Sequence, residues 1–198
     1  EEPVEIQPNV EDITSISQEY YIHYNDVMDR QECSEEWYIE YKALLDENRD
    51  VVGSPDDLTK EFTEAEIKLF QSCVETEVHG GSFQAKVNVA NVILNRLYDE
   101  NKWANDITGV ITSPNQFAHS QVSIDESTKL AIEYAYQFPD TTQGAEYFNR
   151  GTATSGSNAS LDYIFTDDVG HSFFKDKTNY VPTDIITNNL ENDDDSVG

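Results

Sequence analysis

One acidic side chain interrupts an apolar pattern near the middle of the chain. Residues three, four and seven apart share one face of a helix, and Glu77 lies at these distances from Val74, Cys73 and Phe70. Glu77 therefore continues an apolar stripe, whereas Glu75 is expected on the opposite, solvated side. Loss of hydration favours the protonated form of a carboxyl group, which is the form that a general acid needs. The spacing indicates acid–base chemistry at Glu77.

The end of this helix leaves a second interpretation open. Gly80 and Gly81 follow Glu77 within one turn, so the main chain there is free to leave room for a ligand. If the helix frayed before Glu77, its carboxylate would lie in water or form a salt bridge with Lys86.

Two helices are expected to position this residue. Thr63 and Glu66 have the spacing of a capping box, which predicts a helix start that leads to the Gly80-Gly81 pair. A second helix is predicted from Ser82 through Leu97. It is apolar on most faces, as expected for a central helix, except for a stripe formed by Asn88, Asn91 and Asn95.

The rest of the pattern predicts a mainly α fold with minor β structure (α+β). Residues 125–138 have helical periodicity, and short extended pieces are expected at 145–149 and 163–165. The spacing of aromatic and aliphatic residues over 16–48 predicts one or two amphipathic helices before this domain.

Composition divides the chain into four parts. Residues 1–15 are expected to be a disordered acidic lead-in, 16–60 an N-terminal helical extension, 61–180 the main folded domain and 181–198 an acidic flexible tail.

The cysteines allow two interpretations. Cys33 and Cys73 are too far apart for a metal knuckle. They could form a disulfide if the N-terminal extension packs on the main domain. Alternatively, they are two small buried hydrophobic residues.

The charge of the chain argues against several classes of protein. With 39 acidic and 12 basic residues, the net charge is −27, which disfavours nucleic acid and anionic lipid as partners. No apolar run approaches the roughly 20 residues of a membrane-spanning helix, and the acidic start does not resemble a signal peptide. The four histidines lack metal-site spacing, so we expect neither a metal nor a cofactor.

Three blocks of sequence resemble the SleB-type family of cell-wall hydrolases, which includes the spore-cortex-lytic enzymes. The first block, Val74 to Gly81 with Val87 to Arg96, is similar to the family's glutamate-containing turn and V-I-L-N-R helix. The second, Trp103 to Ile111 with Ser113 to Phe117, is similar to the family's N-T-x-x-G-V-I and P-G-Q-F. The third, Gly144 to Asn149 with Gly170 to Phe174, is similar to its A-x-Y-F-N and G-x-H-x-F.

The resemblance implies a lysozyme-like fold of the goose-type lysozyme and lytic transglycosylase kind, acting on the glycan strands of peptidoglycan. It places the family's catalytic glutamate at Glu77, which would cleave the MurNAc–GlcNAc β-1,4 bond. No second carboxylate stands out as a partner, so a lytic transglycosylase that forms 1,6-anhydro-MurNAc fits best. The protein is then expected to be a monomer located outside the cell or in the cell wall.

Six further residues are candidates for substrate binding. Gln116, Tyr147 and Asn149 could hold sugar hydroxyl and acetamido groups, and Phe117 and Phe148 could pack on sugar rings. The phenylalanines could equally be ordinary core aromatics. His171, the sixth, fits a structural role better than a catalytic one.

The chain also departs from the family pattern. The family's E-A-R-G-E reads Glu77-Val78-His79-Gly80-Gly81, so the arginine and the second glutamate are missing, and G-x-H-x-F is one residue short before His171. A non-catalytic peptidoglycan-binding module on a decayed lysozyme-like fold is therefore an alternative. Another is an N-acetylmuramoyl-L-alanine amidase or cysteine peptidase that uses Cys73 with His171.

Overall fold

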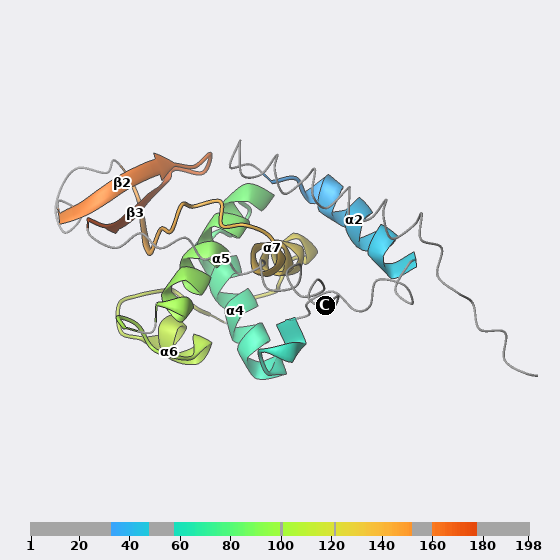
Figure 1. Cartoon of the computed structure of the whole chain (residues 1–198), viewed down its shortest axis with the longest axis horizontal. Coiled ribbons are helices and arrows are strands. Elements are labelled where there is room, and N and C mark those ends of the chain that lie inside the picture. The colour runs from blue at the N-terminus through green and yellow to red at the C-terminus, as the bar shows by residue number, and fades with distance from the viewer. Residues whose placement is uncertain (1–32, 48–57, 100, 121, 152–159, 178–198) are drawn as a thin grey trace, which may run out of the picture.

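The computed structural model describes residues 33–47, 58–99, 101–120, 122–151 and 160–177 (Figure 1). The predicted lead-in and tail, and the predicted helix before Cys33, lie outside the described residues.

A group of helices is followed by a small sheet. The elements in chain order are α2 (Glu35–Glu47), the short 3-10 helix η1 (Leu58–Lys60), α4 (Glu64–Glu77), α5 (Phe83–Tyr98), α6 (Ile107–Thr112), α7 (Glu126–Gln137), β1 (Tyr147–Arg150), β2 (Leu161–Thr166) and β3 (His171–Asp176). The expected mainly α fold with minor β structure is confirmed.

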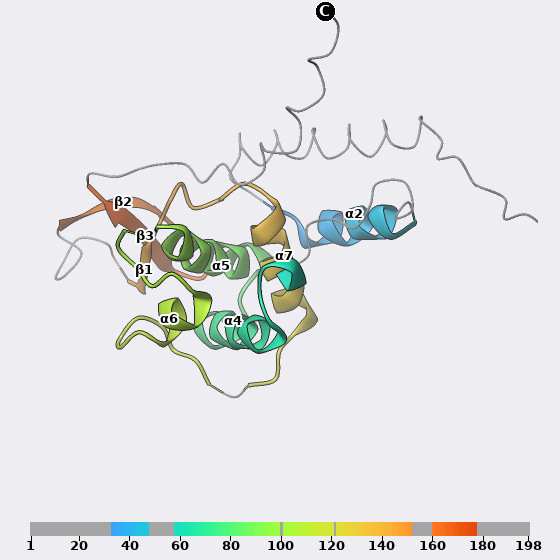
Figure 2. The same cartoon turned by 60° about the horizontal axis from the view of Figure 1, so that its bottom comes forward.

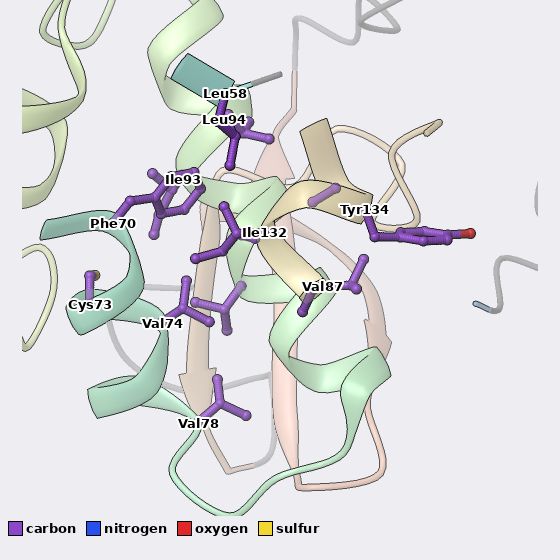
Figure 3. Packing of buried hydrophobic residues seen from close by; sticks show 14 of the residues in the cluster. Leu58, Phe70, Cys73, Val74, Val78, Val87, Ile93, Leu94, Ile132 and Tyr134 are labelled. Carbon is purple, nitrogen blue, oxygen red and sulfur yellow. The ribbon is translucent and has the colours of Figure 1, made fainter. Parts of the chain in front are cut away.

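Helix α5 is the centre of the domain. It packs against α4, α6, α7 and β1, and every residue from Ala85 to Leu97 is buried. Core side chains from η1, α4, α5 and α7 meet in one cluster (Figure 3). Because α5 is covered on all sides, its polar residues must find partners inside the protein.

The asparagine stripe of α5 supplies one set of these partners. Asn91 donates to the Thr141 hydroxyl at 3.0 Å, and Asn95 donates to the Ala145 carbonyl, also at 3.0 Å. The stripe thereby fixes the segment that leads into β1, because Asn91 and Asn95 both donate to residues of that segment.

The sheet and α2 lie on opposite sides of the group of helices that contains α5 and α7 (Figures 1 and 2). Its strand order is β1-β3-β2 and all pairs are antiparallel. Tyr147 and Tyr163 both pair with Phe174, so these three side chains share one face. Phe148 and Phe165 pair with Phe173, so they share the other face, which packs against α5.

The predicted helix boundaries around the candidate acid are confirmed. Thr63 forms the capping box with Glu66, α4 ends at Glu77, and Ser82 caps α5 through a 3.1 Å bond to the Ala85 amide. Helix α6 and strand β3 were not predicted. Helix α6 has only six residues and contains Gly109, which weakens any helical signal.

The described part of the N-terminal extension packs on the main domain. Trp37 and Tyr38 of α2 lie edge to face against Phe138 and Tyr134, with ring centroids 5.6 and 5.3 Å apart. Helix α2 therefore belongs to the same hydrophobic core as α4 and α5.

Candidate active site

Glu77 is the last residue of α4 and its side chain is partly exposed. Its Oε1 accepts a hydrogen bond from the backbone amide of Ala118, in the segment between α6 and α7. The carboxylate is therefore held against a loop at a helix end, neither sealed in the core nor free in solvent. The alternative in which the helix frays before Glu77 is wrong, because α4 includes it.

The expected solvation of Glu75 is also wrong. Glu75 is fully buried, and its Oε2 accepts hydrogen bonds from the Thr128 hydroxyl and, at 3.2 Å, from the Asp125 amide. The side of α4 opposite the apolar stripe faces the N-terminus of α7 rather than water. Periodicity within one helix could not show that a second helix end covers this side.

The charge state of Glu75 follows from these contacts. Burial raises the pKa of Glu75, but hydrogen bonds from Thr128, His79 and the Asp125 amide, with the charge of Lys86, outweigh burial and hold it below its ordinary value. Lys86 is buried and lies 3.8 Å from Asp125, so the predicted alternative pairing of Lys86 with Glu77 is not formed.

His79 replaces the arginine of the family motif and has a different partner. Its Nδ1 lies 2.9 Å from Oε1 of Glu75, one turn earlier, while the ring is largely exposed. His79 therefore joins the buried Glu75 cluster and adds no donor to Glu77 among the contacts of the described residues.

The second departure, Gly81, has a steric reason. A Cβ at position 81 would lie 2.5 Å from Val78 Cγ1 and 3.4 Å from Val169 Cγ1. The turn between β2 and β3 therefore approaches the end of α4 closely, and the Ser82 hydroxyl donates to Asp168 of that turn at 2.9 Å. A glutamate at position 81 does not fit this arrangement.

Three of the predicted substrate-binding residues form a continuous row beside the Glu77 loop. Phe117 precedes Ala118 and lies 6.2 Å from Phe148, and Phe148 lies 5.2 Å from His171 by ring centroids. His171 is buried, and its Nδ1 lies 3.5 Å from Oδ2 of Asp167. The row connects the loop that holds Glu77 to the turn that contacts Gly81.

Tyr147 and Asn149 occupy the opposite face of the sheet from Phe148, because neighbouring residues of a strand alternate. Tyr147 lies against Trp103 at 5.7 Å, and Lys102 is 4.6 Å from its ring. The Asn149 Oδ1 atom is buried and has no hydrogen-bond partner within the part of the chain that the structure describes. The four predicted residues that lie on strands are thus divided between two faces of the sheet.

Gln116 is bound by Arg96, a residue for which the sequence pattern indicated no separate role. Arg96 of α5 donates from Nη1 to Gln116 Oε1 at 2.9 Å and from Nε to the Glu146 carbonyl at 2.6 Å. Burial lowers the pKa of Arg96 to about 10, although Tyr147 and Glu146 oppose this shift. The sequence signal that could have identified Arg96 is a single arginine that follows a mainly apolar helical segment.

The cysteines are not joined by a disulfide. Cys73 is fully buried, and burial followed by the neighbouring Glu77 raises the pKa of its thiol. Cys33 donates to Gln84 Oε1 through its backbone amide at 2.7 Å. A buried, protonated thiol is a poor nucleophile, which argues against the predicted alternative of Cys73 with His171.

Within the described residues, no helix is long and apolar enough to cross a membrane. In the same parts of the chain, no group of three or more His, Cys, Asp or Glu residues is placed to hold a metal ion.

A family of known proteins matches a segment that contains most of the three sequence blocks. Residues 80–175 match the family described as Cell Wall Hydrolase. Over these residues the chain is similar to that family. The matched segment begins three residues after Glu77, so it contains the loop and sheet around the candidate acid but not the acid itself.

Two curated relatives are spore cortex-lytic enzymes. The chain is 36% identical to the enzyme from Halalkalibacterium halodurans over 101 residues, covering 48% of this chain and 30% of that protein. It is 29% identical to the enzyme from Oceanobacillus iheyensis over 114 residues, covering 54% and 41%. The chain therefore spans less than half the length of the curated relatives that it matches.

Two solved structures confirm the resemblance to SleB-type cell-wall hydrolases. The catalytic domain of the Bacillus cereus SleB protein matches with a TM-score of 0.52 and 28% identity, covering 63% of this chain and 97% of that domain. The catalytic domain of the germination-specific lytic transglycosylase SleB from Bacillus anthracis matches with a TM-score of 0.53 and 27% identity, covering 62% and 100%. The expected lysozyme-like architecture is thereby confirmed.

Proposed function

We propose that this cell wall hydrolase domain degrades peptidoglycan by cleaving the MurNAc–GlcNAc bond, with Glu77 as general acid and then general base. The observation that carries the proposal is the position of Glu77. It ends a helix, is partly exposed, and has its carboxylate held by the Ala118 amide. The relatives described as spore cortex-lytic enzymes, and one described as a lytic transglycosylase, support the substrate class.

The neighbouring carboxylates support a mechanism with one acidic residue. Glu75 is buried among its own donors, and Glu146 forms an ion pair with Lys102. Neither is available as the nucleophile or base that two-carboxylate glycosidases use. We therefore propose that the substrate supplies the second group itself.

A lytic transglycosylase reaction meets this condition. Protonated Glu77 gives its proton to the glycosidic oxygen as the bond from that oxygen to the anomeric carbon of MurNAc breaks, and the 2-acetamido group stabilises the positive charge. The C6 hydroxyl of MurNAc then attacks the anomeric carbon and gives its proton to the Glu77 carboxylate. The 1,6-anhydro ring closes and Glu77 is protonated again, so the proton balance is complete.

Product analysis tests this reaction. Purified cell walls and spore cortex would be incubated with the protein, and the soluble fragments identified by mass spectrometry. Release of 1,6-anhydro-muropeptides supports the proposal, and reducing MurNAc ends would replace it with hydrolysis. Free stem peptides would indicate the amidase alternative, and bound protein without soluble products would indicate a non-catalytic binding module.

A further inference from the structure

Among the described residues, Arg96 is a buried cation that forms no direct salt bridge with a carboxylate. It is 4% exposed in a chain with net charge −27. Within the described residues, its hydrogen bonds go to the Glu146 backbone carbonyl and the Gln116 side-chain amide oxygen. Burial of an arginine without a direct ion pair is costly, so this arrangement calls for a role beyond filling the core.

Aromatic rings fix the orientation of the guanidinium group. Its Cζ lies 4.3 Å from the ring centroid of Trp103, 4.5 Å from that of Phe117 and 5.6 Å from that of Tyr147. Cation–π contacts of this kind strengthen when the cation is removed from water. Arg96 therefore holds Phe117 by its ring and Gln116 by its side chain.

These two residues immediately precede the amide that contacts the candidate acid. Gln116 and Phe117 lead directly to Ala118, whose N–H donates to Glu77 Oε1. The charges of Arg96 and Glu77 also interact. A continuous set of contacts thus runs from the last turn of α5 to the end of α4.

We infer that Arg96 is a positioning residue for Glu77. Arg96 fixes the backbone of residues 116–118, so that the Ala118 amide donates its hydrogen bond to the Glu77 carboxylate. It acts through the loop and does not touch the substrate. The planar fork of arginine is essential, because a lysine keeps the charge but cannot hold Gln116 and the Glu146 carbonyl in the same geometry. Its effect on turnover rests on the proposed function, whereas its effect on the Ala118 amide does not.

The amide of Ala118 provides a direct readout by NMR. In the unaltered protein its proton should be shifted downfield by the carboxylate, and Glu77→Gln should move it upfield. Arg96→Lys should produce an upfield shift of the same sign and faster hydrogen exchange at Ala118. The matched control is Arg150→Lys, since Arg150 is exposed at the end of β1. This control should leave the Ala118 signal unchanged.

Activity provides the second readout. Arg96→Lys should lower kcat about 10²-fold, the scale of a displaced catalytic group, with little change in KM or in the thermal midpoint. In a Glu77→Gln background, Arg96→Lys should cause no further loss. An unshifted Ala118 amide in folded Arg96→Lys, or a further loss in the double variant, would overturn the inference.

A second variant covers the case in which Arg96→Lys does not fold. Gln116→Met removes the acceptor of Arg96 and retains the length of the side chain. It should shift the Ala118 amide in the same direction, and an unchanged amide would contradict the inference. If instead Glu77→Gln retains full activity, the proposed function fails, while the NMR result on Arg96 still stands or falls by itself.

Discussion

Two glutamates lie two residues apart on α4 and differ in almost every respect. Glu75 is fully buried and receives hydrogen bonds from Thr128, the Asp125 amide and His79. Glu77 is partly exposed, and its side chain accepts a hydrogen bond from the Ala118 amide. One carboxylate is saturated by the protein, and the other retains acceptor capacity for a substrate.

Burial alone therefore does not identify the reactive carboxylate. Glu75 is the more buried group, yet its partners hold it as a structural anion at the N-terminus of α7, where a helix favours negative charge. A general acid has to exchange its proton, which requires free acceptor capacity and access. Glu77 meets both conditions because α4 ends there.

The strongest way to sharpen the comparison is Glu75→Gln. The change removes a buried charge that three donors and Lys86 stabilise, so the free energy of unfolding should fall by about 3 kcal/mol. Turnover per folded molecule should change little. Chemical denaturation with the activity of the folded fraction measures both, and unchanged stability would show that the Glu75 cluster is not structural.

Shortening the candidate acid is the next test. Glu77→Asp keeps the carboxyl group but withdraws it from the Ala118 loop, so activity should fall about 10²-fold with the thermal midpoint nearly unchanged. The rate of peptidoglycan solubilisation measures the effect. Full activity of this variant would mean that the placement of the carboxyl group does not matter.

The pH dependence of stability gives a third test. Because the pKa of Glu75 is held below its ordinary value in the folded state, its ionised form stabilises the protein above the unfolded pKa of about 4.3. This contribution is lost as pH falls through the lower, folded pKa. The stability gap between the unaltered protein and Glu75→Gln should therefore narrow on acidification below about pH 4.3, as measured by urea unfolding. A difference in stability that widens on acidification would contradict the lowered pKa of Glu75 in the folded state.

The smallest effect is expected at the other end of α4. Thr63→Ala removes the side-chain cap that accepts from the Glu66 amide, and should cost about 1 kcal/mol of stability. Urea unfolding at neutral pH provides the value for one ordinary helix cap on the same helix. If Thr63→Ala lowered the free energy of unfolding as much as Glu75→Gln does, the Glu75 cluster would stabilise the protein no more than an ordinary helix cap.

The sequence predicted the helices that position the site because their signals are local. The Thr63–Glu66 capping box, the Gly80-Gly81 break and the Ser82 start all lie within one or two turns of the boundaries that they define. The extended pieces that became β1 and β2 had similar signals. Strand β3 did not, since the alternation of Phe173 and Phe174 has meaning only once β1 and β2 lie on either side.

The site itself could be predicted only in part. Glu77 was identified from the apolar stripe and from the resemblance, and its role stays a prediction. The burial of Glu75 depends on α7, 50 residues away along the chain, and the contacts of Arg96 depend on Gln116 and Glu146, 20 and 50 residues away. No short-range pattern contains these contacts.

The most direct test of the account compares Glu77→Gln with Glu75→Gln on the same peptidoglycan. The initial rate of soluble product release would be measured per folded molecule, with the folded fraction taken from unfolding curves. The account predicts a loss of 10²–10⁴-fold for Glu77→Gln, as expected for a general acid, and a rate within a few-fold of the unaltered protein for Glu75→Gln. Retained activity in Glu77→Gln, or an equal loss in both, would contradict it.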